Sequence, residues 1–340
     1  MKIDNEYTSS MRPCLIPPLV SGGIMLSYRC SSTCKHCLYN CSPRQPDEWM
    51  TPDTAGKLVE ALLKEPRLGG LHLAGGEPTL RPELLIEMIR LINAAGLSLE
   101  YVETNAGWCR DRTRAKVLME RMREAGLRCM LVSVSMFHNE FIPFSSTRNC
   151  IELCREVFGP GGVFVYMPHI YDILATMPDD GTHTLEEFMA HAGISDRAEL
   201  AKMYSLTPGG RAPRALRASY RPEPAESFRG QTCRNHLLST SHFHIDHMGR
   251  LFTGTCAGIL AGAIADLHPL KTPQTSPVFV TLCERGSAGL MDVAVEKYGF
   301  IPDQAGYVSK CDLCFKVRRH LVAAEVFSEL QPASFYEKEL

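Results

Sequence analysis

The chain has 340 residues, of which 45% are hydrophobic and 22% charged, and this composition fits an enzyme-sized globular domain with a smaller attachment. Its 36 basic and 38 acidic side chains nearly balance, so charge gives no reason to expect nucleic acid or anionic lipid as a main partner. No apolar run is long enough for a membrane-spanning helix, and the N-terminus lacks the order of a secretory signal. We therefore expect a cytoplasmic protein.

Strand-like and helix-like segments alternate along the first half of the chain. Short apolar runs bounded by glycine predict strands, and apolar residues at helical spacing predict helices. The alternation predicts parallel strands covered by helices, which right-handed crossovers close into a full or partial barrel. The predicted strands are 24–28, 71–74, 97–102, 129–134 and 163–166, and the helices between them are one capped by Thr51 and three at 82–95, 112–125 and 146–158.

The pattern weakens after Tyr166. Helical periodicity predicts two further helices, at 185–191 and 195–203. A short run at 204–207 predicts a sixth strand.

Residues able to carry chemistry follow four of the predicted strands. The carboxyl ends of parallel strands form the site in folds of this kind. We therefore expect the four features to meet at one rim. They are the first cysteines, the turn Gly75–Pro78, residues 103–105 and residues 133–135.

Fourteen cysteines need an explanation, and without a secretory signal, metal binding or catalysis is a better expectation than disulfides. Cys30, Cys34 and Cys37 form a C-x3-C-x2-C pattern directly after the first predicted strand. Three thiolates on one loop can bind three irons of a cubane [4Fe–4S] cluster, which leaves the fourth iron open. A structural zinc site is the alternative, and Cys41 could supply its fourth ligand.

The first cysteines and the glycine turn resemble the radical S-adenosylmethionine (SAM) superfamily. The family pattern is C-x3-C-x-Φ-C, with His36 at the aromatic-like position Φ here, and its GGEP motif stands at Gly75–Pro78. The resemblance covers roughly residues 24–211 and implies a partial (β/α)6 barrel. It also implies that SAM fills the open iron site and that an electron from the cluster cleaves SAM to a 5′-deoxyadenosyl radical. Such an enzyme is oxygen-sensitive and needs a reductant such as flavodoxin or ferredoxin.

The resemblance places the methionine end of SAM at the glycine turn. Gly75 and Gly76 would let the backbone approach a ligand closely, and Pro78 stiffens the turn. Glu77 and exposed backbone carbonyls can accept hydrogen bonds from the SAM ammonium. A plain tight turn is the alternative interpretation.

Further SAM contacts are expected after the third and fourth strands. Thr104 and Asn105 resemble a T-N-G feature of the family, with Ala106 in place of the glycine. The hydroxyls of Ser133 and Ser135 could bind the ribose or the carboxylate of SAM. Each of these side chains can instead be an ordinary strand-end cap.

Two arginines and one loop provide the remaining candidates. Arg148 and Arg211 are candidate carboxylate clamps, because arginine binds carboxylates through two parallel hydrogen bonds. His138 and Glu140, at the predicted barrel mouth, are candidate acid or base residues. The alternatives are solvated arginines and a polar loop without catalytic function.

A second cysteine set lies in the last third of the chain. Cys233, Cys256, Cys311 and Cys314 offer four thiolates, the last two as a C-x2-C pair. Their layout resembles the twitch and SPASM extensions of the radical SAM family, and this implies an auxiliary [4Fe–4S] cluster. The small number of cysteines fits the single-cluster twitch form. Zinc is the alternative metal, and Cys283 can replace one assumed ligand.

These patterns divide the chain into five segments. A stretch rich in Arg, Pro, Ala and Ser is typical of a linker, and the Cys-, His- and Gly-rich sequence after it has little helical periodicity. We expect that sequence to form a small twitch-like α+β extension. The segments are 1–23 as a lead-in, 24–211 as the radical SAM core, 212–230 as the linker, 231–315 as the auxiliary cluster domain and 316–340 as a C-terminal helix and tail.

A histidine-rich string in the extension suggests a different chemistry. His242, His244, Asp246 and His247 follow the H-x-H-x-D-H pattern with which metallo-β-lactamase-like hydrolases bind two metal ions. Too little sequence follows for that fold. We expect a strand that leads into a hairpin at Gly249, with one histidine able to face the substrate cavity or the auxiliary cluster.

Together the features predict a radical SAM enzyme, an oxidoreductase by expectation, that abstracts hydrogen from a small molecule or a short peptide. The auxiliary cluster would bind the substrate or accept an electron from it. A peptide-modifying maturation enzyme is the main alternative. From the 23-residue lead-in we expect no fused peptide-binding domain, and a separate partner could supply one. A zinc-binding scaffold and the hydrolase are the alternatives from other classes.

Overall fold

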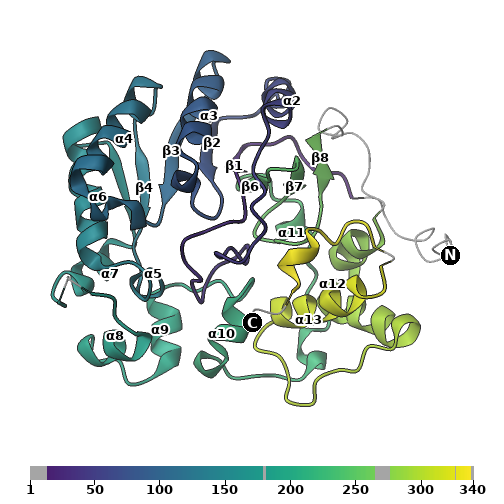
Figure 1. The fold of residues 1–340 in the computed structure, drawn as a ribbon. Helices are drawn as coiled ribbons and strands as arrows, with labels where there is room; N and C mark the ends of the chain where they lie inside the picture. The colour runs from purple at the N-terminus through teal and green to yellow at the C-terminus, as the bar shows by residue number, and fades with distance from the viewer. Residues whose placement is uncertain (1–13, 179–180, 265–275, 326, 338–340) are drawn as a thin grey trace.

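A computed structural model describes residues 14–178, 181–264, 276–325 and 327–337 (Figure 1). Parts of the predicted lead-in, extension and tail therefore lie outside the described residues. None of the described helices is long and apolar enough to cross a membrane.

An eight-stranded sheet lies at the centre of the molecule, in the order β5-β4-β3-β2-β1-β6-β7-β8. Strands β1 to β6 run parallel, whereas β7 and β8 are added antiparallel at one edge. The predicted α/β class with a mostly parallel sheet is confirmed. The strands are β1 (Ser21–Met25), β2 (Gly70–Ala74), β3 (Leu99–Thr104), β4 (Met130–Ser133), β5 (Val163–Tyr166), β6 (Phe243–Ile245), β7 (Arg250–Phe252) and β8 (Gly262–Ala263).

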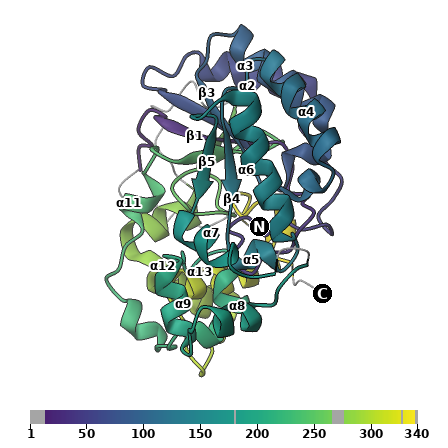
Figure 2. The ribbon, with the colours of Figure 1, turned by 90° about the vertical axis from the view of Figure 1, so that its left-hand side faces the viewer.

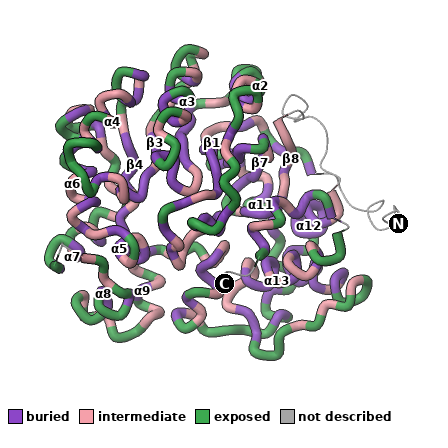
Figure 3. Tube along the Cα trace, viewed as in Figure 1, coloured by how far each residue is buried: buried purple, intermediate pink, exposed green. Residues whose placement is uncertain are grey.

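Helices return the chain between the first five strands and lie along one face of them (Figure 2). Two begin at side-chain caps, because Thr51 Oγ1 accepts from Thr54 N at 3.1 Å and Asp111 Oδ1 accepts from Arg114 N at 3.1 Å. Buried segments follow the strands and the inner sides of these helices, and exposed segments lie outside (Figure 3). The helices are α2 (Pro52–Leu62), α3 (Pro82–Ala94), α4 (Arg112–Glu124) and α6 (Phe144–Phe158), with the short α5 (Met136–Asn139) before α6.

The sixth parallel strand comes from a different segment than predicted. Residues 204–207 form no strand, because Tyr204 ends a helix and its N–H donates to Leu200 O at 3.1 Å. Ser205, with φ +50°, then turns the chain. The sixth strand is β6, which pairs in parallel with β1. Sequence from the predicted extension thus continues the core sheet.

The second half of the chain is more helical than its composition suggests. The predicted linker packs against the protein as short helical turns and buries Leu216 and Phe228. A kink at Gly286 interrupts the longest helix, α12, whose periodicity the sequence analysis missed. The helices are α7 (Pro168–Leu174), α8 (Leu185–His191), α9 (Arg197–Met203), α10 (Ala212–Ala215), α11 (Arg234–Leu237), α12 (Pro277–Tyr298) and α13 (Lys310–Val322).

Candidate active site

The first cysteines lie on a loop after β1 that packs against the glycine turn after β2. Gly76 N donates to Ser27 O at 2.9 Å, and Glu77 N donates to Arg29 O at 3.0 Å. A Cβ at position 76 would lie 1.9 Å from Arg29 O, and Gly75 has a φ of +146°. The glycines are therefore needed because the turn touches the protein's own cysteine loop. The sequence analysis had attributed this close approach to a ligand.

Arg211 holds the same loop. Its side chain is only 2% exposed and donates to the backbone oxygens of Cys34 at 2.6 Å and Cys41 at 2.8 Å. It also donates to Asn40 Oδ1 at 3.2 Å, and its backbone N–H donates to Cys37 O at 3.0 Å. This guanidinium is engaged with the loop carbonyls that it positions, and its role as a carboxylate clamp stays a prediction.

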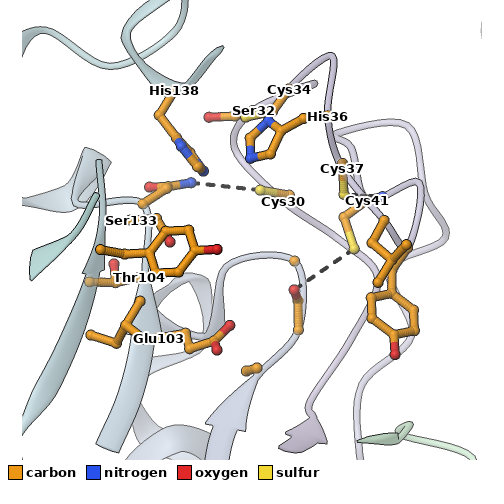
Figure 4. Close-up of a pocket in the computed structure, with 18 of the residues that line it drawn as sticks. Cys30, Ser32, Cys34, His36, Cys37, Cys41, Glu103, Thr104, Ser133 and His138 are labelled. Atoms are coloured by element: carbon orange, nitrogen blue, oxygen red, sulfur yellow. Dashed lines mark hydrogen bonds between the residues drawn. The ribbon is translucent and has the colours of Figure 1, made fainter. Parts of the chain in front are cut away.

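One cavity of about 490 Å³ brings the predicted rim features together. In Figure 4 the cysteine loop forms one wall of this cavity, and the ends of β3 and β4 form the opposite wall. The predicted site residues that line it are Cys30, Cys34, His36, Cys37, Gly75, Gly76, Thr104, Asn105, Ser133 and His138. The predicted residues outside its lining are Glu77, Pro78, Ser135, Glu140, Arg148 and Arg211.

The three thiols of the loop do not share one electrostatic environment. Burial raises the pKa of Cys30 to about 12, and the charge of nearby Glu77 adds to the effect. Burial also raises the pKa of Cys34, whereas a hydrogen bond with the Cys41 thiol lowers that of Cys37. Buried thiols of this kind become thiolates together only when a bound cation compensates their charge. The donor set therefore fits a metal centre.

Glu77 joins the glycine turn to the end of β3 and does not line the cavity. It is only 2% exposed, and its carboxylate accepts from Thr79 Oγ1 at 2.6 Å, from Thr104 Oγ1 at 3.0 Å and from Asn105 N at 2.8 Å. These donors turn the Glu77 carboxylate away from the cavity lining, and its contact with the SAM ammonium stays a prediction. The carboxylate fixes the geometry between two rim segments.

Asn105 connects the third strand to the cysteine loop. Its Nδ2 donates to Ser31 Oγ at 3.0 Å and to Cys30 Sγ at 3.6 Å. Ala106, which replaces the glycine of the family feature, adopts a left-handed conformation with φ +67°. That conformation normally favours glycine. The backbone geometry of the T-N-G feature is thus kept without its glycine.

His36 and His138 form an aromatic wall of the cavity. The His36 ring stacks on Phe137 at 4.8 Å and meets His138 edge-on at 5.0 Å. His138 Nδ1 lies 2.7 Å from Ser135 Oγ, and burial lowers the pKa of His138 to about 4. The imidazole of His138 is therefore uncharged at neutral pH. Ser135 also caps α5, which is the ordinary role considered for it.

Two further candidates lie away from the cavity lining. Glu140 forms an ion pair with Lys35 on the cysteine loop. Arg148 lies on α6 with its guanidinium carbon 5.2 Å from the ring centre of Phe144. The structure therefore does not bring Glu140 or Arg148 to the predicted chemistry.

The strands contribute cavity residues that the sequence analysis did not propose as site residues. Along β3, β4 and β5 the side chains that face the cavity are two residues apart, as expected for one face of a sheet. Burial, and then the charge of Glu77, raise the pKa of Glu103 to about 7. Alternation with period two was the available signal. These residues are Tyr101, Glu103, Leu131, Phe164 and Tyr166.

The histidine string divides between two environments. His242 and His244 line the cavity from β6. Asp246 instead accepts from Tyr28 Oη at 3.0 Å and from Arg250 Nε at 2.7 Å. His247 packs edge-on against Tyr28 at 5.8 Å. The four residues therefore do not converge as the hydrolase interpretation requires, whereas the predicted strand and hairpin are present.

The second cysteine set comes together from three segments. Cys233 caps α11, Cys256 follows β7, and the C-x2-C pair lies at the start of α13 rather than before the C-terminal helix. Burial raises the pKa of Cys256, and the charges of the other three thiols raise it further. Cys283 forms a hydrogen bond with Cys14 instead.

Residues 24–189 match the family model described as the Radical SAM superfamily. The matched residues, just under half of the chain, are thus similar to radical SAM enzymes. The match supports the enzyme class predicted from the sequence, and this superfamily implies a [4Fe–4S] cluster and SAM.

Individual relatives are more distant. "Putative peptide biosynthesis protein YydG" of Bacillus subtilis (strain 168) is 23% identical over 133 residues, which are 39% of this chain and 41% of the relative. The chain thus matches about two fifths of the length of that curated relative. Among solved structures, BtrN in complex with AdoMet and 2-DOIA has a TM-score of 0.44 and 13% identity, covering 80% of this chain and 90% of BtrN. Native anSMEcpe with bound AdoMet and Cp18Cys peptide has a TM-score of 0.44 and 15% identity, covering 91% and 98%.

Proposed function

We propose that this radical SAM enzyme cleaves SAM reductively at a cluster held by Cys30, Cys34 and Cys37 and abstracts hydrogen from an organic substrate in the adjoining cavity. The observation that carries the proposal is the single cavity of about 490 Å³ that the three cysteines share with the glycine turn and the strand ends. When bound, the cluster and SAM supply a 5′-deoxyadenosyl radical. The protein itself would position SAM and the substrate and would shield the radical from water.

The spacing of the thiols supports a multi-iron cluster over a single zinc ion. A tetrahedral zinc site with Zn–S bonds of about 2.3 Å holds its sulfur atoms about 3.8 Å apart. Among the described residues, the one set of three candidate ligand atoms within 4.8 Å of one another consists of histidines and includes no cysteine. Three thiols on one loop beside a cavity suit a cluster with an open iron, whereas structural zinc uses four protein ligands.

The residues around the cavity have distinct tasks in this proposal. The backbone of Gly75 and Gly76 faces the cavity and would bind the polar methionine end of SAM, while the Ser133 hydroxyl would bind the ribose or the carboxylate. The aromatic side chains of Phe164 and Tyr166 would exclude water from the radical. His138, uncharged at neutral pH, can form a hydrogen bond with a substrate group at the cavity mouth.

The second cysteine set would hold an auxiliary [4Fe–4S] cluster. All four thiols would be used as ligands, so this cluster would have no open iron. The buried guanidinium of Arg318 lies beside Cys314 and donates to Ala257 O at 2.9 Å, which places a positive charge next to the thiolates. Tyr39 lines the cavity, and its pKa is raised by burial and by nearby Cys256. An auxiliary cluster behind Tyr39 would be placed to accept an electron from a substrate radical.

The substrate is an organic molecule or a short peptide. The name of the Bacillus subtilis relative supports the peptide alternative, although the match spans only 41% of that relative. A flavodoxin or ferredoxin would supply the electron. The twitch form of the extension, its domain boundaries and an oxidative outcome belong to the same proposal.

The deciding experiment uses protein purified and reconstituted without oxygen. SAM and dithionite are added, and 5′-deoxyadenosine is measured by chromatography. We expect the product from the wild type and none from Cys34→Ala, whereas Cys129→Ala, a half-buried cysteine outside the cavity lining, retains it. Zinc in place of iron, with no SAM cleavage, would support the scaffold alternative and overturn the proposal.

A further inference from the structure

His72 and His244 approach each other across Gly23, in the wall of the cavity that the strands form. Gly23 on β1 pairs with His72 on β2 and, on its other side, with His244 on β6. A Cβ at Gly23 would lie 2.4 Å from His72 Nε2 and 2.9 Å from His244 Nε2. The absence of a side chain at this one position therefore creates the space in which the two imidazoles approach each other across an intervening strand.

His242 adds a third imidazole from the same face of the sheet. It precedes His244 by two residues, and its ring lies 4.9 Å from that of His244 and 5.5 Å from that of His72. One ligand atom from each of the three residues lies within 4.8 Å of the others. Metal–nitrogen bonds of about 2.1 Å place such atoms about 3.4 Å apart, so modest side-chain rotation would complete the site.

The buried nitrogens of this cluster lack the partners that buried imidazoles normally have. His72 is 1% exposed and His244 is 6% exposed, yet His72 Nε2 and His244 Nδ1 have no hydrogen-bond partner among the residues that the structure describes. Buried polar groups without partners are uncommon, and each calls for an explanation. A bound cation would satisfy these nitrogens.

Glu103 supplies a carboxylate at the same position. Its Oε1 lies 3.6 Å from His72 Nε2, which is too long for a hydrogen bond, and its side chain is 34% exposed toward the cavity that it lines. Tyr101 stacks on the His72 ring at 4.9 Å and fixes its orientation. Three imidazoles and one carboxylate form a donor set that suits zinc and other divalent transition metals.

We infer that His72, His242, His244 and Glu103 form a site for one divalent transition-metal ion in the cavity wall, separate from both cysteine sets. The ion would face the cavity and could bind an oxygen of the substrate as a Lewis acid. This site goes beyond the proposed function, which requires no third metal. It also differs from the hydrolase pattern in the sequence, because Asp246 and His247 are not part of it.

The test uses the reconstituted holoenzyme, whose cysteines are occupied by clusters. After EDTA treatment, Zn²⁺ is added, and bound zinc is counted by elemental analysis beside iron. We expect one zinc per chain and at least tenfold weaker binding in His72→Gln and in His244→Gln. His247→Gln changes a histidine of the same string outside the cluster, and we expect it to bind zinc as the wild type does. Gly23→Ala keeps every ligand but fills the space between them, so it should also weaken binding.

Cobalt identifies the ligands. The Co²⁺ difference spectrum of the holoenzyme should show ligand-field bands without sulfur-to-cobalt charge transfer, because nitrogen and oxygen atoms bind the ion. The iron and sulfide contents of each variant show whether it has folded. If the histidine variants do not fold, Glu103→Gln, the mildest change, is used in their place. The site would be overturned if the holoenzyme bound no zinc in addition to its iron, or if the cobalt spectrum showed thiolate charge transfer. It would also be overturned if His72→Gln bound zinc as tightly as the wild type. Formation of 5′-deoxyadenosine is measured separately, so failure of the metal site and failure of the proposed function are distinguishable.

Discussion

The two cysteine sets differ in how the chain assembles them. Cys30, Cys34 and Cys37 lie on one short loop and face a cavity. The second set gathers four thiols from α11, from the loop after β7 and from α13. Three protein ligands beside a cavity leave an iron free for a ligand, whereas four ligands close a cluster off. In the proposed function, this difference separates a site for SAM chemistry from a site for electron transfer.

A buried arginine supports each set in a different way. Arg211 donates to backbone oxygens of the first loop, including those of Cys34 and Cys41, and so fixes the loop's shape. Arg318 lies beside the thiol of Cys314 and places positive charge near the second set. The first set depends on backbone geometry, and the second depends more on charge.

The largest expected effect separates the two sets directly. Cys34→Ala should abolish 5′-deoxyadenosine formation, because the SAM-binding cluster loses a ligand. Cys314→Ala should keep SAM cleavage and lose about four of about eight irons per chain. Iron, sulfide and 5′-deoxyadenosine are measured on the same reconstituted samples. Equal loss of SAM cleavage in both variants would contradict the division of roles.

Removal of the arginine that holds the first loop should be nearly as damaging. Arg211→Met leaves buried carbonyl oxygens without donors, and we expect it to lower the free energy of unfolding by about 3 kcal/mol. Iron at the first cluster should fall with it. Denaturant unfolding measures the effect, and Arg114→Met, whose side chain is 89% exposed, is the control expected within about 0.5 kcal/mol of the wild type. Similar values for the two variants would show that Arg211 does not hold the loop.

The glycine turn should tolerate no side chain at its second position. Gly76→Ala would place a Cβ 1.9 Å from Arg29 O, and we expect a loss of about 2 kcal/mol and a displaced cysteine loop. Gly56→Ala, in α2 with open space around it, should instead stabilise the protein by about 0.5 kcal/mol. Thermal unfolding of both variants checks the sign. A neutral Gly76→Ala would mean that the turn does not pack tightly on the loop.

The smallest expected effect concerns Ala106, which stands where the T-N-G feature of the family has glycine. Ala106 is held at φ +67°, so Ala106→Gly should relieve strain and raise the free energy of unfolding by about 1 kcal/mol. Denaturant unfolding of the cluster-free protein measures the change. A lower stability would show that the buried methyl group contributes more than the backbone strain costs.

Local patterns predicted the first five strands, their helices and the first cysteine loop, because each depends on residues close in sequence. The sixth strand was placed at 204–207, and the pairing of β6 with β1 was missed because it joins segments more than two hundred residues apart. The sequence predicted that Arg211 binds a ligand carboxylate, because a guanidinium donates equally well to carboxylates and to backbone oxygens. The histidine cluster could not be foreseen, because His72 and His244 meet only through their common neighbour Gly23.

The most direct test of the central claim is electron paramagnetic resonance of the reduced holoenzyme with and without SAM. We predict two cluster signals, of which SAM shifts one, and the shifted signal is the one absent from Cys34→Ala. The signal absent from Cys314→Ala should not respond to SAM. A shift of that second signal, or no response of either signal, would contradict an open first cluster beside a closed second one.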